Sequence, residues 1–437
     1  MNTFGRQFKV SIFGESHGEG PGVVIDGCPA GLPVPIEDFM PDMLRRQGGN
    51  QKGATPRKED DIPIFKSGVF NGLTTGAPIA IFFENKNTRS GDYAKQRAFP
   101  RPGHADFVAH TKYGAYEDYR GGGHFSARLT VGIVAAGVIA KKLLQHANTG
   151  LADKISVESH LVEVAGLPDV EAGLQKAIEA KDSVGGIAQC TIKNLPIGLG
   201  EPFWDSIESV MAHACFAIPA VKGIEFGAGF AAAKMFGTEH NDVIENMQGK
   251  TATNHAGGIV GGISNGNDLV FKLAIKPTSS TPKDQLTLNW ETEQMETFSV
   301  RGRHDLCVAL RANPIIEAMA AIVLTDFMLL ENRIERVINE PVYHVATNEQ
   351  WQQAQTQGYY THPSLDAEGF IHTSRPHQLD GVLQRYYHGQ RNLRLLTISP
   401  NLLKVPFVYE LAPSVGEHFP HIFGHIPLNA ITEVKAL

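Results

Sequence analysis

The hydrophobic pattern of this chain predicts two long, largely buried helices. Residues 126–147 repeat apolar side chains at the three- and four-residue spacing of a helix, at Leu129, Ile133, Val134, Val138 and Ile139. Residues 313–331 are apolar over most of their length, with Asn313 as a candidate cap and Pro314 suited to the first helical position. The uninterrupted apolar runs inside both segments are too short to cross a bilayer.

Shorter runs predict strands in the same part of the chain. β-like runs lie at residues 23–25, 79–83 and 269–275, each with glycines nearby. A strand-like FKVSIF run at 8–13 leads into a loop. We therefore expect the first part of the chain to mix α and β structure. It contains no strict sequence repeat.

The character of the sequence changes after Ile334. The last part carries the blocks Tyr343-His344, GFIHTS (369–374), RYYHG (385–389) and EHFPHIFG (417–424). Eight of the chain's 18 histidines follow residue 340. Because they fall within less than a quarter of the chain, we expect a domain boundary between residues 335 and 342.

Composition narrows the class of protein. With 437 residues, 42% of them apolar, the chain can bury a full core, and we expect more than one domain. A net charge of −7 argues against a general nucleic-acid or membrane-surface binder. The four cysteines are scattered, without a C-x-x-C pair, and the N-terminus lacks the apolar run of a signal peptide. We therefore expect a cytoplasmic protein with buried or idle thiols.

Six glycine-containing or small-residue motifs carry the candidate chemistry. Each sets a proton-carrying or cationic side chain close to small residues, which let the backbone approach a ligand. In chain order they are GESHG (14–18), RPGHAD (101–106), YRGGGHFSAR (119–128), NHAGGIVGGISNG (254–266), KPTSS (276–280) and GRHDLC (302–307). In the third, glycines precede the start of a predicted helix, where free N–H groups and the helix dipole favour an anion. Together the motifs predict one large anion-binding active site.

In this order, the motifs resemble those of the chorismate synthase family, from Phe4 to Ile334. The resemblance implies a carbon–oxygen lyase of the shikimate route to aromatic amino acids. Its reaction is the anti-1,4-elimination of phosphate from 5-enolpyruvylshikimate-3-phosphate (EPSP), giving chorismate. It also implies a requirement for reduced FMN without net redox change, because reduced flavin supplies an electron-rich partner for the allylic centre. NADPH is a candidate reductant.

The resemblance also implies the fold and the assembly. The expected fold class is α+β, with a layered β-α-β sandwich core in residues 1–337 and a small α+β domain in 341–437. We expect a homotetramer with a small-molecule substrate, an external flavin reductase as a candidate partner, and no nucleic-acid or membrane partner. The last domain resembles an uncharacterised bacterial domain family with the same GFIHTS and FPH motifs, which is distantly similar to ADP-ribosyltransferase-like folds.

Three residues are candidates for proton transfer by this resemblance. His17 is expected to give a proton near the substrate phosphate, since histidine titrates near neutrality; a surface histidine beside a turn is the alternative. His104 is expected near the flavin, where it would balance charge on the reduced ring, and Asp106 could fix its tautomer. Asp305 is expected near the flavin N5, where the substrate proton leaves. A salt bridge with Arg303 is its alternative.

Arginines are the expected ligands of the substrate anions, because a guanidinium fork matches carboxylate and phosphate geometry. The candidate substrate ligands are Ser16, Arg45, Arg46, Arg101 and Arg128. Any one of these arginines alone would more often be a solvated charge. Arg46 and Lys52 are the candidate NADP ligands. At Gln47 and Lys52 the sequence departs from the family pattern, and Lys52 keeps the charge but lacks the fork.

The candidate flavin ligands come from five parts of the chain. They are His124, Phe125, Ser126, Ala220, Gly261, Lys276, Pro277, Thr278, Ser279, Ser280 and Arg303. KPTSS offers one cation and several hydroxyls to a phosphate, although such a string alone is more often a strand-to-turn transition. HFS replaces the RSS or RAS of many relatives, and RHDLC replaces the commoner RHDPC.

Two other functions stay open from the sequence. A flavin or NAD(P)H oxidoreductase is weaker, because no GxGxxG opens a strand–helix unit with an acidic residue downstream. The third is an anion or nucleotide sensor with the last domain as working module. In that domain His344, His372 and His421 lack the ligand spacing of a structural zinc site, so we expect no metal. His372 and His421 are the first candidates for any activity there.

Overall fold

The computed structural model describes residues 2–47, 53–54, 59–86, 97–300 and 305–437. The chain divides into two compact units. The larger unit comprises Met1–Cys28, Asp38–Ser67 and Pro78–Glu335. The smaller comprises Arg336–Leu437 together with two segments from the first part of the chain, Pro29–Glu37 and Gly68–Ala77.

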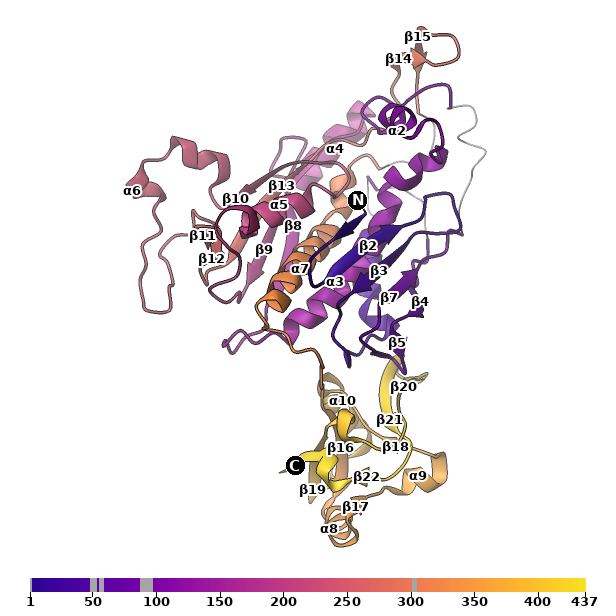
Figure 1. Cartoon of the computed structure of the whole chain (residues 1–437), viewed down its shortest axis with the longest axis vertical. Coiled ribbons are helices and arrows are strands. Elements are labelled where there is room, and N and C mark those ends of the chain that lie inside the picture. The colour runs from indigo at the N-terminus through magenta and orange to yellow at the C-terminus, as the bar shows by residue number, and fades with distance from the viewer. Residues whose placement is uncertain (1, 48–52, 55–58, 87–96, 301–304) are drawn as a thin grey trace. The chain divides into compact units, whose positions relative to one another are not determined.

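Two antiparallel sheets form the outer layers of the larger unit (Figure 1). The first has the strand order β1-β2-β3-β7-β4, with bounds Thr3–Phe4, Lys9–Phe13, Gly22–Asp26, Ile79–Phe82 and Ile64–Ser67. The second has the order β10-β13-β9-β8, with bounds Val221–Phe226, Leu269–Ile275, Gly186–Lys193 and Ser156–Val164. The alternating burial of β13 and β9 shows that the second sheet turns one face to the core.

The helices α3 (Thr130–Gln145) and α7 (Asn313–Leu330) lie between the two sheets and pack on each other (Figure 1). α3 also contacts β2, β3 and β7, whereas α7 contacts β8 and β9. A Cβ built on Gly137 would lie 2.1 Å from the Cβ of Ala318, so the helices approach closely only because residue 137 has no side chain. This arrangement confirms the predicted β-α-β sandwich.

The predicted elements of this unit are found with small shifts at their ends. The helix expected at 126–147 begins with a 3-10 turn, η4 (Ala127–Leu129), and continues as α3. The prediction that Asn313 caps the other helix is wrong. Asn313 is already helical, no side chain caps this helix, and the Asn313 Oδ1 accepts a hydrogen bond from the Ser159 hydroxyl at 3.1 Å.

α7 is also apolar and long enough to cross a membrane by length and composition, but 83% of it is buried inside the protein. A helix packed on both sides inside a sandwich is expected to be apolar all round. Its composition therefore reflects its place in the core. The same explanation holds for α3, in which buried residues run from Thr130 to Ala140 without a break.

Shorter elements surround this sandwich. α1 (Met40–Gln47) packs on α3 and α7, α4 (Val170–Ala180) on β8, and α5 (Ile207–Cys215) on α7 and β10. The others are α2 (Asp106–Tyr113), α6 (Gly237–His240), β11 (Ile259–Val260), β12 (Ile263–Ser264), β14 (Gln285–Asn289), β15 (Gln294–Phe298), η1 (Ile36–Asp38), η3 (Arg120–Phe125), η5 (Phe203–Asp205), η6 (Gly229–Lys234) and η7 (Val308–Arg311).

The smaller unit is also a mixed α and β structure. Its sheets follow the orders β16-β19-β23 and β18-β21-β20, and β17 pairs with β22. The strands are β16 (Val342–Thr347), β17 (Tyr359–Tyr360), β18 (Ile371–His372), β19 (Leu393–Ile398), β20 (Phe407–Ala412), β21 (Glu417–Ile422), β22 (Ile426–Pro427) and β23 (Ile431–Ala436). The helices are α8 (Asn348–Gln357), α9 (Pro363–Glu368), α10 (Leu379–Tyr386), η8 (Pro376–Gln378), η9 (Pro400–Leu402) and η10 (Leu428–Ala430).

Two segments from early in the chain complete this smaller unit. Leu73, the first residue of β6 (Leu73–Thr74), packs against the core formed by Tyr360, Phe407 and their neighbours; β6 pairs with β5 (Val69–Phe70). The backbone of Ala30 exchanges hydrogen bonds with Arg336 and Ile338. The smaller unit therefore contains more of the chain than the predicted domain of residues 341–437.

His344 lies in the core of the smaller unit, where it makes two hydrogen bonds. Its Nδ1–H donates to the His372 carbonyl at 2.6 Å, and its Nε2 therefore accepts from the Tyr360 hydroxyl at 2.7 Å. Burial lowers the pKa of His344 to about 3, which keeps the ring neutral. This histidine serves as a packed, hydrogen-bonded core residue.

The close contact of α3 with α7 predicts that Gly137→Val destabilises the larger unit. The added side chain would overlap Ala318, and overpacking of this kind typically costs about 1–3 kcal/mol. Gly237→Ala is the matched control, because a Cβ on Gly237 in α6 meets nothing within 4 Å. Urea unfolding of both variants measures the difference. Equal stability of the two variants would show that the helices can separate without cost.

The buried neutral His344 predicts that the smaller unit loses stability as the pH falls from about 6.5 toward 3. In this range the unfolded histidine takes up a proton that the folded one does not, at roughly 1.4 kcal/mol per pH unit. Hydrogen exchange of β16 and β19 amides against pH measures this loss. His344→Gln is expected to flatten the slope, whereas His388→Gln is the control. An unchanged slope in the His344 variant contradicts the assignment.

Candidate active site

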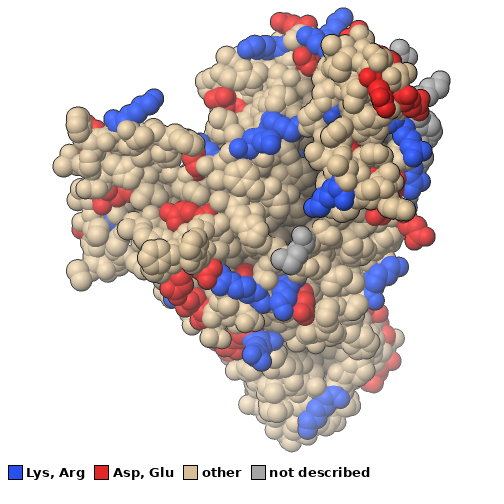
Figure 2. All heavy atoms as spheres, turned by 45° about the horizontal axis from the view of Figure 1, so that its top comes forward, with Lys and Arg blue, Asp and Glu red and all other residues tan. Residues whose placement is uncertain are grey.

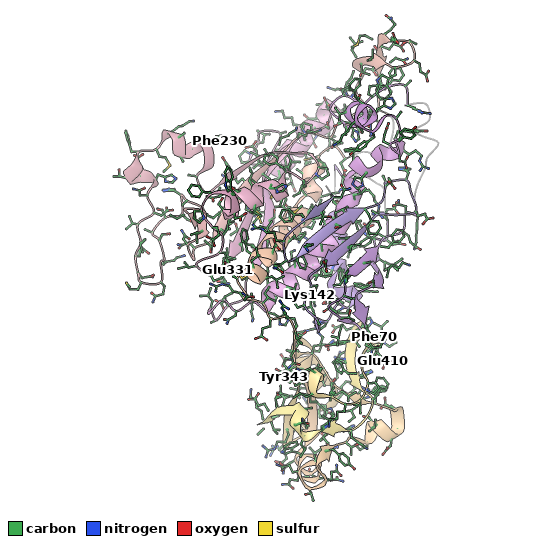
Figure 3. The ribbon with its side chains drawn as sticks, in the orientation of Figure 1. Phe70, Lys142, Phe230, Glu331, Tyr343 and Glu410 are labelled. Carbon is green, nitrogen blue, oxygen red and sulfur yellow. The ribbon has the colours of Figure 1, made fainter. Side chains whose placement is uncertain are left out.

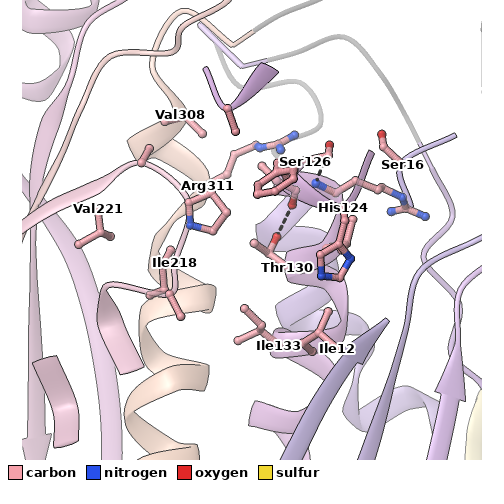
Figure 4. Close-up of a pocket in the computed structure, with 18 of the residues that line it drawn as sticks. Ile12, Ser16, His124, Ser126, Thr130, Ile133, Ile218, Val221, Val308 and Arg311 are labelled. Carbon is pink, nitrogen blue, oxygen red and sulfur yellow. Dashed lines mark hydrogen bonds between the residues drawn. The ribbon is translucent and has the colours of Figure 1, made fainter. Parts of the chain in front are cut away.

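A cavity of about 760 Å³ lies in the larger unit, where α3 and α7 begin (Figure 4). Five of the six motifs contribute to its lining; residues 254–266 do not. Because both helices present their N-terminal ends, their dipoles favour an anionic ligand here. The face of the molecule drawn in Figure 2 shows Lys and Arg interspersed with Asp and Glu.

A loop of three glycines packs against both candidate histidines, His17 and His104. Gly121, Gly122 and Gly123 all have positive φ, which side chains other than glycine rarely adopt. A Cβ on Gly121 would lie 2.3 Å from the His17 ring, and one on Gly122 would lie 3.0 Å from the His104 ring. The loop therefore lies directly against both imidazole rings, and side chains on Gly121 and Gly122 would collide with them.

Asp106 holds His104 in one tautomer. The His104 Nδ1 lies 2.5 Å from Asp106 Oδ1, so Nδ1–H donates to the carboxylate, and in the neutral ring Nε2 is the acceptor. Arg101 clamps the same carboxylate through Nε at 2.7 Å and Nη2 at 2.8 Å. Although burial alone would raise the pKa of Asp106, the hydrogen bonds from Arg101 and His104 hold it well below its usual value. The carboxylate therefore stays ionised.

Asp61 bridges two buried arginines beneath the cavity. Its carboxylate accepts from Arg46 Nη2 at 2.5 Å and from Arg128 Nη1. Burial would raise the pKa of Asp61, but the two guanidinium groups hold it below its usual value. Two cations against one anion leave the cluster with a net positive charge. The cluster is thus suited to a further anion from the ligand.

Asn85 ties the loop of His17 to this cluster. Its Nδ2 donates to the carbonyl groups of Glu15 and Ser16, each at 3.1 Å, and of Gly18 at 3.0 Å. Its Oδ1 accepts from Arg128 Nε at 3.1 Å. One amide side chain therefore fixes where His17 lies relative to Arg128.

Residues 276–280 form a second wall, rich in hydroxyl groups. Lys276 Nζ donates to Ser279 Oγ at 2.7 Å, and Ser279 Oγ donates to the Gly103 carbonyl at 2.7 Å. Thr278 Oγ1 is buried and has no hydrogen-bond partner within the described residues. Burial, and after it the charge of Lys222, lower the pKa of Lys276. This wall has donors that a bound anion would use.

Asp305 and Arg311 meet at the start of α7. Arg311 Nε lies 3.7 Å from Asp305 Oδ1, and Arg311 Nη1 donates to the Gln47 carbonyl at 3.4 Å. Figure 4 shows Arg311 extending from the end of η7 toward Ser126 at the start of the other helix. Its Nε is buried without a hydrogen bond among the described residues. Arg311 is therefore a further cation that faces the cavity.

Comparison with known proteins identifies the family. The family model described as chorismate synthase matches residues 8–329. A chorismate synthase of Chitinophaga pinensis is 66% identical over 337 residues, covering 77% of this chain and 99% of its own. One of Dehalococcoides mccartyi is 44% identical and covers 78% and 100%. This chain belongs to the chorismate synthase family.

A solved structure and a second family model extend this comparison. A crystal structure of chorismate synthase matches 75% of this chain and 93% of its own with a TM-score of 0.57 at 27% identity. A model described as a protein of unknown function, DUF952, matches residues 345–434. The chain is thus a lyase of aromatic amino acid biosynthesis with an additional domain, as the motifs predicted.

Most of the predicted site residues lie around one cavity. Those that line it are Ser16, His17, Arg46, Arg101, His104, His124, Phe125, Ser126, Arg128, Ala220, Lys276, Pro277, Thr278, Ser279, Ser280 and Asp305. Arg45 does not line it; its guanidinium donates to the Glu317 carboxylate at 2.7 and 2.8 Å. Gly261 lies outside the lining, in the turn between β11 and β12. Lys52 and Arg303 lie outside the described residues.

Sequence reasoning missed Asp61, Asn85 and Arg311. Asp61 and Asn85 lie outside every motif, and only the folded chain brings them to the arginines and to His17. Arg311 had a weak signal, because it follows the GRHDLC motif by four residues and precedes a predicted helix. A lone arginine at a helix start is more often a solvated charge, so its position alone does not predict a ligand.

The glycine loop predicts that Gly121→Ala lowers turnover on the order of 10²-fold. The added methyl group meets the His17 ring at 2.3 Å, and a displacement of about 1 Å in a catalytic group can have this effect. Gly150→Ala is the matched control: Gly150 has a similar positive φ, but nothing lies within 4 Å of its Cβ position. Rates of phosphate release measure the effect. If both variants slow equally, backbone strain is the cause and the contact with His17 is not.

Proposed function

We propose that this enzyme converts EPSP to chorismate and phosphate by anti-1,4-elimination and requires reduced FMN. The reaction breaks the C–O bond to phosphate and one ring C–H bond, replaces the C=C bond between them by two C=C bonds at shifted positions, and transfers no net electrons. The observation that carries the proposal is the single cavity that gathers His17, His104, Asp305 and a set of arginines. Such a set offers proton carriers and anion clamps together.

The residues suit separate roles in this elimination. His17, beside the positively charged pair Arg46 and Arg128, would give a proton to the departing phosphate. Asp305 at the other wall would accept the ring proton. Arg311 Nε lies 3.7 Å from Asp305 Oδ1 and would pair with that carboxylate. Proton donor and acceptor on different walls fit a reaction that removes two groups from distant ring atoms.

The cavity also fits the expected flavin. The unpartnered Thr278 hydroxyl, Lys276 and the Ser279 and Ser280 hydroxyls would hold its phosphate. Apolar lining residues such as Phe125, Ile218 and Val221 would contact its ring system. When bound, reduced FMN supplies electron density to the allylic centre of the substrate. His104, fixed by Asp106 with its Nε2 as acceptor, would orient the polar edge of that ring or take a proton from it.

Fewer residues support the proposals for the source of the reduced flavin and for the partners. Arg46 is a candidate NADP ligand in this cavity, and Lys52, its proposed companion, lies outside the described residues. The proposal therefore includes NADPH or an external flavin reductase as alternative sources. The enzyme domain of residues 1–337 would carry all of this chemistry. No activity is proposed for the domain of residues 341–437.

Assembly into a homotetramer is part of the proposal. Apolar side chains are exposed along the segment that contains η6 and α6, at Phe230 (83% exposed), Phe236 (76%), Ile244 (71%) and Met247 (96%). Figure 3 shows Phe230 on this segment, which projects from the rest of the larger unit. Exposed apolar surface of this kind is typical of a protein–protein interface. Light scattering at several concentrations, with Phe230→Ser and Phe236→Ser as variants, measures the assembly.

The test of the function is phosphate release from EPSP under two conditions. We expect chorismate when FMN is chemically reduced without oxygen. Activity in air with NADPH and FMN alone would show that the enzyme reduces its own flavin, whereas activity only after a reductase is added assigns that step to a partner. Undiminished turnover in flavin-free enzyme without reductant would refute the flavin requirement.

Arg311→Met is expected to raise the KM for EPSP about tenfold to a hundredfold. The methionine fills similar space but removes a cation, and a hydrogen bond to a charged group contributes about 1.5–3 kcal/mol. Arg333→Met is the matched control, since Arg333 donates only to carbonyl groups outside the cavity. Steady-state kinetics and FMN titration separate substrate from cofactor binding. A KM equal to that of the control removes Arg311 from the substrate site.

A further inference from the structure

A second cavity, of about 310 Å³, lies behind the His104–Asp106–Arg101 group. Arg101, Ala105 and Phe125 line both cavities, so the two share a wall. The second cavity takes its other residues from 97–122 and from Trp290 and Glu291. The backbone N–H of Trp290 donates to the Ala98 carbonyl at 2.8 Å, and this hydrogen bond joins the two parts of the cavity wall. Its volume is at the lower end of the ~300–1,000 Å³ of small-molecule sites.

Glu117 gives this cavity an acidic group with unused bonding capacity. Its Oε1 accepts from His110 Nδ1 at 3.1 Å, and its side chain is 15% exposed. Its Oε2 is fully buried and has no hydrogen-bond partner in the part of the chain that the structure describes. A buried carboxylate oxygen without a partner is costly, so the site favours a cationic donor such as an ammonium group.

The neighbouring carboxylate does not compete for such a ligand. Asp118 also lines the cavity, but its two oxygens accept from Arg120 Nε at 2.8 Å and Nη2 at 2.7 Å. These hydrogen bonds lower the pKa of Asp118. Of these two adjacent carboxylates, Glu117 is therefore the one with a buried oxygen that a ligand could use.

Aromatic side chains form much of the remaining wall. Trp290 stacks on His110 with a centroid distance of 4.6 Å, and Phe99 and Phe125 lie elsewhere in the lining. Arg97 also lines this wall and lies 5.0 Å above the Tyr119 ring. Such a wall would contact a planar aromatic ring, and the guanidinium would pair with a carboxylate. The cavity thus combines an anion, a cation and aromatic surface.

We propose that this cavity binds a free aromatic amino acid. Glu117 would hold the ammonium group, Arg97 the carboxylate, and Trp290 and Phe99 would contact the aromatic ring. Because Asp106 lines the same cavity and holds His104 at 2.5 Å, an occupant would contact the residue that orients a proposed catalytic histidine. Binding would therefore alter turnover through the shared wall. The binding step does not depend on the proposed reaction.

Calorimetric titration of the full-length enzyme with L-tryptophan, L-tyrosine and L-phenylalanine tests this proposal. We expect saturable binding of at least one of them, weakened at least tenfold by Glu117→Gln and by Trp290→Leu, with Glu433→Gln in the smaller unit as control. N-acetyl-phenylalanine, which lacks the ammonium group, should not bind, nor should L-leucine. Phenethylamine, which lacks the carboxylate, should bind more weakly and should be insensitive to Arg97→Gln.

Three results would overturn the site. The first is that no amino acid binds at concentrations up to about 1 mM, which would be a weak site. The second is binding that Glu117→Gln does not weaken. The third is competition with EPSP that persists in the Glu117→Gln variant. FMN titration checks that each variant remains folded. It also distinguishes the loss of the amino-acid site from a failure of the proposed reaction. Turnover that does not change with bound amino acid would reject the coupling through Asp106 and leave the binding site.

Discussion

The close packing of α3 on α7 is the constraint on which the larger unit depends. Gly137 and Ala318 allow the two helix backbones to approach until a single additional methyl group would not fit. Each helix then covers one sheet, so the sandwich has a thin, mostly apolar centre in which Thr325 donates a hydrogen bond to the Ala140 carbonyl. Because both helices begin beside the cavity, this contact also decides that two helix dipoles converge on one site.

The charges of the site are arranged before any ligand arrives. Asp61 and Asp106 each engage an arginine or a histidine, and buried groups of opposite sign fix one another's positions. Asn85 and the glycine loop add hydrogen bonds and steric limits that hold His17 and His104. A rigid set of donors needs little reorganisation when charge develops on a bound ligand.

The smaller unit depends on a different kind of interaction. Its histidines are concentrated in a core and along two strands, where they pair with backbone, tyrosine and glutamate groups. His421 Nδ1–H donates to Glu410 Oε2 at 2.7 Å, and the ring stacks on Phe370 with a centroid distance of 4.0 Å. Burial lowers the pKa of His421, as it does for His344. Within the described residues, no group of three histidine, cysteine or acidic side chains could hold a metal ion.

The sequence by itself determined the elements with strong periodicity and the motifs that carry chemistry. The two core helices, the strand at 269–275 and the family were predictable, because apolar spacing and glycine-rich strings are local properties of the chain. Only the tertiary structure decided which motifs meet. It brought five of them to one cavity, left Arg45 paired with Glu317 and placed Gly261 elsewhere. It also recruited Asp61, Asn85 and Glu117, whose roles depend on partners far away in sequence or on burial, which no local pattern encodes.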